Sequence, residues 1–576
     1  MTVDRYLAVV GPTGPERDTI VADAVRRLEL TIAFEARSLT VLVSQGTSLF
    51  ELGGRGAVVG GLFPNQAADT ERLHRGATAS GGRLLVDMAW GDYVALLTEG
   101  GDVHARVLRS PSGGLHAFVA QIGRLHLVAS DVELILGINA VAISVDWNFV
   151  TDHLVFPHLR GRRTGLTTID EIFPGDAALI RDTGYDRQGY WSPWRFAAPH
   201  VAQPTLEEAA RLVERAVLEA TRRLSDRYPT VLLELSGGLD SSIVAAALEG
   251  SESKVRAVNF VTPTGEGDER RYARAVAVRT GMSLAELPAS SDIDLVRALP
   301  TRTPRPGLPG MLRNWEEQLV VAASEANASA FFGGTGGDNV FCSLGSAAPA
   351  TDALRVFGPG TRFFSAARAV ARVHHSTVWS ATWRALRQAL RPRPPQSWPR
   401  VDDFVAPEVR PPAPPFHPWL IEPDDALPGT RSHIRSIMAA QAHLDGYLRH
   451  AVAPSVFPLL AQPVIQACLA VPTWTWIEGG VDRAVARHAF AARLPEIIVQ
   501  RQTKGMMNAF SAQAYARNRP RLIPFLLGGH LARQRIIDQT ALEPYLRQTG
   551  PVRDTRFYRV LALVDVELWL RGWLGY

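Results

Sequence analysis

The stretch from Leu235 to Ser242, LSGGLDSS, contains the residue types that bind a nucleotide polyphosphate. Glycines let backbone amides come close to phosphate oxygens, and serine hydroxyls donate hydrogen bonds to them. A carboxylate such as Asp240 would be repelled by phosphates unless a divalent cation lay between them. We therefore expect a nucleotide site with Mg²⁺ on Asp240, formed by Leu235, Ser236, Gly237, Gly238, Asp240, Ser241 and Ser242. The plainer alternative is a helix N-terminus capped by serines.

The flanking segments place this stretch where phosphates bind. Residues 230–235 form an apolar, β-branched run of strand length, and residues 241–248 have the composition of a helix start. Backbone amides at the turn between a strand and a helix point outward at the positive end of the helix dipole. The sequence contains no G-x-x-x-x-G-K-[ST] motif, so a P-loop is excluded.

A second glycine-rich loop repeats the pattern. Residues 330–332 form a short apolar strand, which Gly333, Gly334 and then Asp338 follow. On an adjacent parallel strand this loop would face the first one, and Asp338 and Asp240 could share one Mg²⁺. The alternative for this loop alone is a turn with a helix-capping aspartate.

The length and pattern of the chain predict two domains. At 576 residues it is too long for one core. Up to residue 195, short apolar runs separated by turns predict packed β-sheets, for example at 6–10, 93–97, 115–120 and 125–129. Strands then alternate with helices, as in a parallel sheet. We expect an α/β protein with a β-rich domain at 1–200 and a second domain at 205–576, with a proline-rich insertion near 391–418.

Composition excludes several classes of protein. The net charge is +4, but the basic residues are scattered, which argues against nucleic-acid binding. No apolar run is long enough for a transmembrane segment, the start lacks a signal peptide, and the two cysteines fit a reducing compartment, so we expect a cytoplasmic protein. Only Lys254 and Lys504 are lysines among 61 basic residues, so Lys504 draws attention as a titratable cation.

These motifs resemble those of the asparagine synthetase superfamily. Residues 236–242 are similar to its pyrophosphate motif and residues 333–339 to its second nucleotide loop; 455–464 and 494–505 resemble later stretches. Residues 91–97, 109–115 and 127–133 follow, more loosely, the order of its glutaminase domain. The resemblance implies a glutaminase-like sandwich before an ATP-pyrophosphatase domain, with ATP and Mg²⁺ as cofactors. It also places Val258 and Leu235 where the family's backbone meets adenine.

Two departures from the family pattern indicate a particular branch. Thr2 stands where the family's glutaminases have a cysteine, so glutamine is not expected to supply ammonia. Thr335, three residues before Asp338, replaces the glutamate of asparagine synthetases and the tyrosine of the β-lactam-forming members. The loop followed by Asp338-Asn339-Val340-Phe341-Cys342 resembles that of lasso peptide cyclases.

The resemblance to lasso peptide cyclases implies a ligase that forms a macrolactam. A peptide Asp or Glu carboxylate would be adenylated and then attacked by the peptide's own N-terminal amine, with Asp240, Asp338 and Lys504 as catalytic residues. The expected partners are a leader-cleaved precursor peptide, a leader peptidase and a leader-binding protein. Two alternatives stay open: an ammonia-dependent amide ligase acting on a small amino acid, and a noncatalytic nucleotide-binding scaffold.

Overall fold

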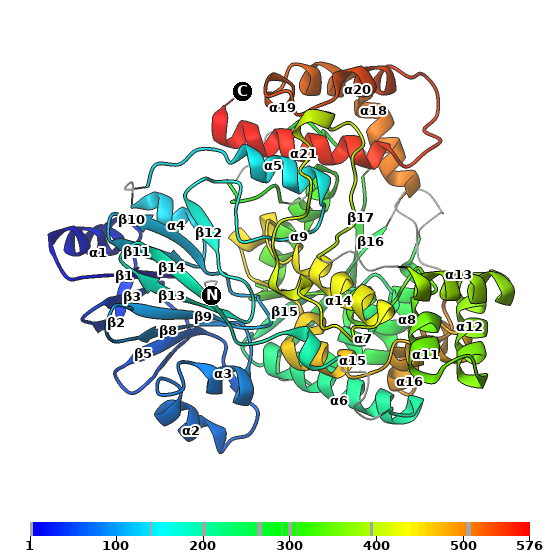
Figure 1. Ribbon diagram of the computed structural model, residues 1–576, viewed down its shortest axis with the longest axis horizontal. Coiled ribbons are helices and arrows are strands. Elements are labelled where there is room, and N and C mark those ends of the chain that lie inside the picture. The colour runs from blue at the N-terminus through cyan, green and yellow to red at the C-terminus, as the bar shows by residue number, and fades with distance from the viewer. Residues whose placement is uncertain are drawn as a thin grey trace.

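The computed structural model describes residues 4–138, 141–197, 203–261, 268–290, 292–297, 302–307, 309–391, 396–502 and 508–575. Two antiparallel sheets form the N-terminal part, and a parallel sheet covered by helices forms the rest (Figure 1). The mixed α/β class expected from the sequence is confirmed.

The N-terminal part is a sandwich of two six-stranded sheets. Alternate residues of the facing strands, such as Tyr6, Ala8, Val94 and Leu96, form a buried core between them. The first sheet has the order β12 (Ile169–Glu171), β10 (Phe118–Ile122), β11 (Leu125–Ala129), β1 (Tyr6–Val10), β3 (Leu39–Val43) and β2 (Thr31–Ala36). The second has the order β14 (Gly184–Gly189), β13 (Asp176–Arg181), β9 (Ala105–Arg109), β8 (Tyr93–Thr98), β5 (Gly56–Gly60) and β4 (Leu49–Glu51).

Short helices cover the outer faces of this sandwich. Helices α1 (Pro15–Arg27) and α4 (Val132–Gly137) lie beside the first sheet, and α2 (Asp69–Gly76) and α3 (Arg83–Met88) beside the second (Figure 1). Strands β1 and β11 have the predicted bounds, whereas β10 starts at Phe118 rather than at the predicted residue 115. Helix α1 was not predicted from the sequence.

The parallel sheet has the order β17 (Ser283–Pro288), β16 (Lys254–Val261), β15 (Thr230–Glu234), β18 (Ala330–Phe332) and β19 (Ser455–Val456). The central strands β15 and β18 are buried on both faces, which explains their continuous apolar sequences. On one face Val231 and Leu233 pack with residues of α6 (Leu206–Ser225), α7 (Leu239–Leu248) and α8 (Arg270–Thr280). On the other face Leu232 packs against α9 (Arg313–Ala326).

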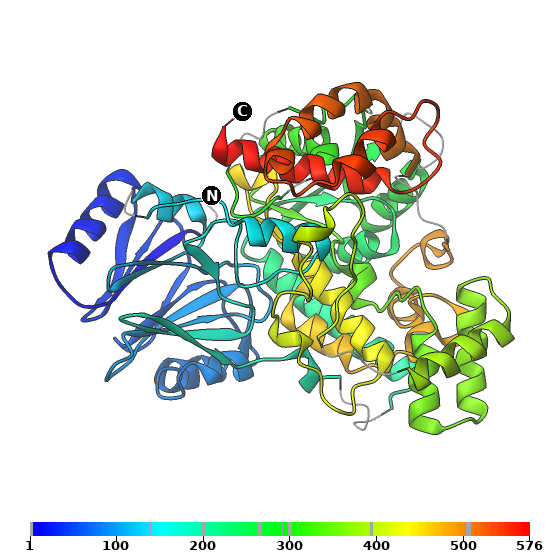
Figure 2. The ribbon, with the colours of Figure 1, turned by 45° about the horizontal axis from the view of Figure 1, so that its top comes forward.

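Most of the remaining helices fall into three groups. Helices α11 (Ala348–Phe357), α12 (Thr361–Val373) and α13 (Val378–Leu390) make a bundle that projects from the body (Figures 1 and 2). Helices α18 (Asn508–Leu527), α19 (His530–Arg533), α20 (Gln539–Leu546) and α21 (Phe557–Leu574) gather near the C-terminus (Figure 2). Between them lie α10 (Gly337–Val340), α14 (Pro428–Gln441), α15 (Gln462–Leu469), α16 (Ala484–Phe490) and α17 (Glu496–Val499). None of the helices described is both long and apolar enough to cross a bilayer.

The described part of the proline-rich segment ties other elements together. The Trp398 indole donates a hydrogen bond to the Pro157 carbonyl (2.9 Å), and the Val401 amide donates to that of Val155 (2.9 Å), at the end of α5 (Trp147–Val155). Val405 bridges to Ile537 in the C-terminal helices. This segment therefore connects the N-terminal part to the helices at the end of the chain.

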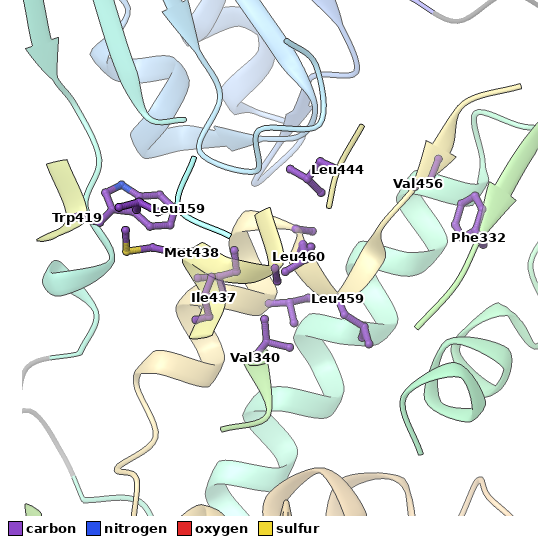
Figure 3. Close-up of a cluster of buried hydrophobic side chains, with 14 of the residues drawn as sticks. Leu159, Phe332, Val340, Trp419, Ile437, Met438, Leu444, Val456, Leu459 and Leu460 are labelled. Atoms are coloured by element: carbon purple, nitrogen blue, oxygen red, sulfur yellow. The ribbon is translucent and has the colours of Figure 1, made fainter. Parts of the chain in front are cut away.

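Apolar side chains join the N-terminal sandwich to the rest of the protein. Leu159 packs in the same cluster as Trp419, Met438, Leu444 and Leu460, which come from the C-terminal part (Figure 3). Because all of these side chains are buried, the two parts share one continuous core.

A group of buried charges crosses the same interface. The Glu171 carboxylate of β12 lies 2.7 Å from an Arg109 nitrogen, 2.9 Å from Arg160 and 2.7 Å from Arg305. Arg160 also pairs with Asp445 at 2.7 Å. Burial alone would raise the pKa of Glu171, but Arg160, Arg305 and Arg109 outweigh it and hold that pKa well below its usual range.

Candidate active site

The first glycine loop connects β15 to α7 at the carboxyl edge of the parallel sheet. Gly237 has a φ of +72°, and a Cβ there would lie 2.5 Å from the Cβ of Tyr272, so both conformation and space require glycine. Gly238 has ordinary extended dihedrals and is the N-cap of α7, which begins at Leu239. The helix thus starts two residues before the predicted position, and no serine side chain caps it.

The serines of this loop bind one another and the loop backbone. The Ser236 and Ser241 hydroxyls are 3.1 Å apart, and the Gly238 amide donates to the Ser236 hydroxyl at 3.2 Å. The Ser242 hydroxyl donates to the Gly238 carbonyl at 2.7 Å. These bonds fix the turn that presents the α7 N-terminus, where an anion is stabilised.

Leu235 and Val258 lie beside each other at the carboxyl edge of the parallel sheet. The Leu235 amide donates to the Val258 carbonyl at 2.8 Å, and the Asn259 side-chain amide donates to the Leu235 carbonyl at 2.8 Å. Both side chains are buried in the core. The two residues therefore lock β15 to β16 beside the loop.

The second glycine loop lies directly against the first one. Strand β18 pairs with β15 in parallel, as the sequence predicted. A Cβ on Gly334 would lie 2.4 Å from the Ser241 amide nitrogen, and one on Gly337 would lie 2.3 Å from the Asp240 carboxyl carbon. Glycine at these positions allows the two loops to interlock at the sheet edge.

The two predicted metal ligands meet at one nitrogen. The Nη1 atom of Arg483 lies 2.9 Å from Asp240 Oδ1 and 2.5 Å from Asp338 Oδ1. The Asp240 and Arg483 side chains are largely buried, whereas that of Asp338 is half-exposed. Desolvation would lower the pKa of Arg483, but Asp240, Asp338 and Asp482 outweigh it and raise that pKa. The Arg483 guanidinium thus binds both carboxylates and offsets part of their negative charge.

The close contact at Gly334 gives a testable prediction. We expect Gly334→Ala to force the loops apart and reduce kcat/KM for ATP by about 10²-fold, because small displacements at a reacting centre have effects of that size. Gly333→Ala is the matched control, since its Cβ would meet Glu234 at an ordinary 3.6 Å. Equal activity of the two variants, measured as initial rates, would contradict the interlocked arrangement.

Arg483 and Arg501 were not identified from the sequence. Arg483 is the N-cap of α16 with a left-handed φ of 54°. Arg501 donates to the Gly237 carbonyl at 2.9 Å, pairs with Glu269 at 2.5 Å and stacks on the Tyr272 ring at 3.9 Å. Arginine is so frequent in this chain that neither residue stood out, although Arg501 lies within the stretch that resembles the family.

A buried ion cluster supports the end of β15 on its other face. Arg449 binds Glu234 at the strand end and Glu316 of α9, the latter with its Nε 2.9 Å from Oε1. Burial would lower the pKa of Arg449, but the two glutamates outweigh it and raise that pKa. The cluster joins β15, α9 and the turn before β19 beneath the nucleotide loop.

The remaining candidates lie at the edge of what is described. Lys504, predicted to be catalytic, and Thr2, which stands in place of the glutaminase cysteine, are outside the described residues. Arg501 brings the chain to the first loop three residues before Lys504. Ten of the residues predicted to bind the nucleotide lie together at one edge of the parallel sheet, with Asp338 beside them. They are Leu235, Ser236, Gly237, Gly238, Asp240, Ser241, Ser242, Val258, Gly333 and Gly334.

A family model described as asparagine synthase matches residues 210–571, well over half of the chain. The chain belongs to the asparagine synthase family. The match includes the parallel sheet, both glycine loops and Arg483. This asparagine synthase family member is therefore an ATP-dependent ligase that forms C–N bonds.

No curated protein sequence matches the chain. Two solved structures are similar to it at low identity. One is the allosteric regulatory enzyme of purine biosynthesis, with 10% identity and a TM-score of 0.22, covering 51% of this chain and 82% of that chain. The other is glutamine phosphoribosylpyrophosphate amidotransferase from B. subtilis complexed with ADP and GMP. It has 11% identity and a TM-score of 0.21, and the match covers 49% of this chain and 65% of that chain.

Proposed function

We propose that this protein is a lasso peptide cyclase that closes a macrolactam ring in a ribosomally made peptide with ATP. The observation that supports nucleotide chemistry is that Asp240 and Asp338, from different loops, both contact the guanidinium of Arg483. The preference for a peptide rests on the motif resemblance, in which Thr335 occupies the place of the family's catalytic glutamate or tyrosine. The division at residues 1–200 and 205–576 and a cytoplasmic location are parts of the same proposal.

The residues at the loops fit Mg²⁺. Two carboxylates of different loops lie within reach of one positive group, and carboxylate oxygens are the protein ligands that Mg²⁺ prefers. Among the described residues no cluster of three or more His, Cys, Asp or Glu could hold a metal, so phosphate oxygens and water would supply the other ligands. When bound, the ion would neutralise charge on the pyrophosphate; Asp240 and Asp338 would hold it.

The proposed reaction has two steps that balance without an external oxidant or reductant. A carboxylate oxygen of a peptide Asp or Glu bonds to the α-phosphorus of ATP, and the bond to the β-phosphate oxygen breaks, which releases pyrophosphate. The peptide N-terminal amine then bonds to the acyl carbon, loses a proton, and displaces AMP. Pre-folding of the peptide makes the second step intramolecular, which contributes much of its rate.

The chain's own residues would bind and orient the nucleotide in the first step. The amides at the start of α7 and the Ser236 and Ser241 hydroxyls would donate to phosphate oxygens. Arg483 would turn from the carboxylates to the released pyrophosphate, and Arg501, which donates to the Gly237 carbonyl, would position the loop. Lys504 is proposed to stabilise negative charge on the acyl or phosphate oxygens.

Substitution of Arg483 should allow Mg²⁺ binding at the carboxylates to be measured through Tm, without an activity assay. We expect Arg483→Met to be destabilised by about 1–2 kcal/mol, a value discounted for the exposure of Asp338, because Asp240 and Asp338 then repel each other. Mg²⁺ bound between the two carboxylates should restore the lost stability. The rise in Tm on addition of Mg²⁺ should therefore be larger for Arg483→Met than for the wild type.

The matched control for that experiment is Arg487→Met. Arg487 lies one turn further along α16 and donates to the carbonyls of Asp482, Val499 and Arg501 rather than to carboxylates. Its loss should lower Tm, but the rise in Tm with Mg²⁺ should stay equal to that of the wild type. A similar response to Mg²⁺ in both variants would remove the support for a metal at the carboxylate pair.

The proposed function is tested with a leader-free precursor peptide from the same gene neighbourhood. We expect ATP-dependent loss of one water from the peptide by mass spectrometry, with AMP rather than ADP as the nucleotide product. Formation of asparagine from aspartate and ammonia would instead establish the ammonia-dependent ligase. Unchanged ATP and peptide, with nucleotide binding retained, would establish a noncatalytic scaffold.

A further inference from the structure

The projecting bundle of α11, α12 and α13 carries an apolar stripe that its own core does not cover. On α13, Trp379 is 82% exposed, Trp383 66% and Leu390 85%. The buried face of the same helix, with Ala381 and Ala385, packs into the bundle core. Burial of large apolar side chains is favourable, so three of them left in water on one helix indicate a binding surface.

The spacing of the stripe is that of a helix-pairing seam. Trp379, Trp383, Leu386 and Leu390 follow one another at intervals of four, three and four residues, the alternation of d and a positions in a heptad. Leu386 is partly buried against the bundle and completes the row. An a/d row forms a narrow stripe, whereas a helix that lies in a membrane surface presents a broad apolar face.

Positive charge flanks the stripe. Arg384 and Arg387 on α13 and Arg391 at its C-cap are exposed, and in the described part of the chain no salt bridge joins any of them to a carboxylate. The single acidic residue between 346 and 391 is Asp352, which is fully buried and accepts hydrogen bonds from the Gly429 and Thr430 amides. The surface of the bundle around the stripe therefore bears positive charges without compensating negative ones.

We propose that the seam on α13, defined by Trp379, Trp383, Leu386 and Leu390, docks an amphipathic helix of another protein that carries acidic residues beside its apolar row. The tryptophans and arginines are the residue types that dominate binding energy at protein interfaces. Acidic residues flanking the partner's row would pair with Arg387 at a heptad e position and with Arg384 and Arg391 beside it. A second copy of this chain is disfavoured, because its arginines would repel these.

The experiment uses a fluorescein-labelled synthetic 21-residue helix with Leu at a and d positions and Glu at e and g positions, titrated with the full-length protein. Fluorescence anisotropy should give a Kd in the micromolar range, and the same peptide with Lys in place of Glu should bind at least tenfold more weakly. Hydrogen exchange should slow in residues 378–391 when the Glu peptide binds.

Two sets of variants test the surface. Trp379→Ser, Trp383→Ser and Leu390→Ser combined should weaken binding of the Glu peptide at least tenfold, and Arg384→Glu, Arg387→Glu and Arg391→Glu combined should make the Lys peptide the better ligand. Val278→Ser with Val321→Ser, at exposed apolar positions of α8 and α9, is the matched control and should change nothing. Since α13 lies outside the nucleotide loops, ATP-dependent activity should be unaffected in all of these variants.

Three results would overturn the proposal. The first is equal binding of the Glu and Lys peptides. The second is binding to vesicles of equal parts phosphatidylglycerol and phosphatidylcholine that depends on Trp379 and Trp383 while the Glu peptide does not bind, which would indicate a membrane surface. The third is a fall in the sedimentation mass of the protein on substitution of the apolar row, which would indicate self-association.

Discussion

Asp240→Asn is expected to reduce the ATP-dependent rate on the order of 10³-fold, because the bound cation stabilises transition-state charge by several kcal/mol and the variant loses one of its two protein ligands. Asp338→Asn should have a similar effect, since both carboxylates reach the same nitrogen of Arg483. The double variant should be little worse than either single variant, because two ligands that act on one ion are not additive. Release of pyrophosphate measures all three rates.

Asp482→Asn is the matched control for that prediction. Asp482 also binds Arg483, with its carboxylate 2.9 Å from the Arg483 Nε atom. Asp240 and Asp338 instead contact the Nη1 atom of Arg483. We expect its loss to change the rate less than tenfold. If Asp482→Asn and Asp240→Asn lose activity equally, the carboxylates serve only to hold Arg483, and the metal assignment is wrong.

Glu171→Gln is expected to destabilise the whole chain by about 3–5 kcal/mol, the usual result of breaking a buried ion pair. The substitution leaves the guanidinium groups of Arg109, Arg160 and Arg305 at the interface with Asp445 as the remaining carboxylate. Urea denaturation at pH 7, followed separately in the N-terminal and C-terminal parts by hydrogen exchange, measures the loss and shows whether the two parts still unfold together.

The same ion cluster predicts how stability depends on pH. The pKa of Glu171 is held well below its unfolded value of about 4.3, so its contribution is complete above that pH and is lost as pH falls through the lower, folded pKa. The difference between wild type and Glu171→Gln should therefore shrink in acid. Asp170→Asn, the half-exposed neighbour on β12, should cost less than about 1 kcal/mol. A cost as large as that of Glu171→Gln would contradict the role given to the buried cluster.

The elements with strong local signals were predictable from the sequence. The capping box from Thr205 to Glu208 marks the start of α6, and the structure contains both of its hydrogen bonds. The apolar run at 330–332 gave β18 and the short runs at 6–10 and 125–129 gave β1 and β11, because these strands are buried. The two-residue strand β19 was missed, since so short an element owes its form to pairing with β18 rather than to its own sequence.

The two glycine loops and their aspartates were the parts of the candidate site that could be predicted from the sequence. Gly334 and Gly337 were seen as a loop, but their contact with Asp240 depends on the distance between two strands that are nearly 100 residues apart. Arg483 could not be found in this way, because its role comes from a left-handed turn that aims one arginine of many at the two carboxylates. The Glu234, Arg449 and Glu316 cluster likewise joins residues far apart in the chain.

The most direct test of the central claim follows an oxygen atom. A peptide labelled with oxygen-18 in its Asp or Glu side-chain carboxylates is incubated with the protein, ATP and Mg²⁺, and the nucleotide products are analysed by mass spectrometry. Attack of the carboxylate on the α-phosphorus predicts AMP that carries one labelled oxygen, together with unlabelled pyrophosphate. Label in inorganic phosphate with ADP as the product, or cyclised peptide with unlabelled AMP, would contradict adenylation at the site held by Asp240 and Asp338.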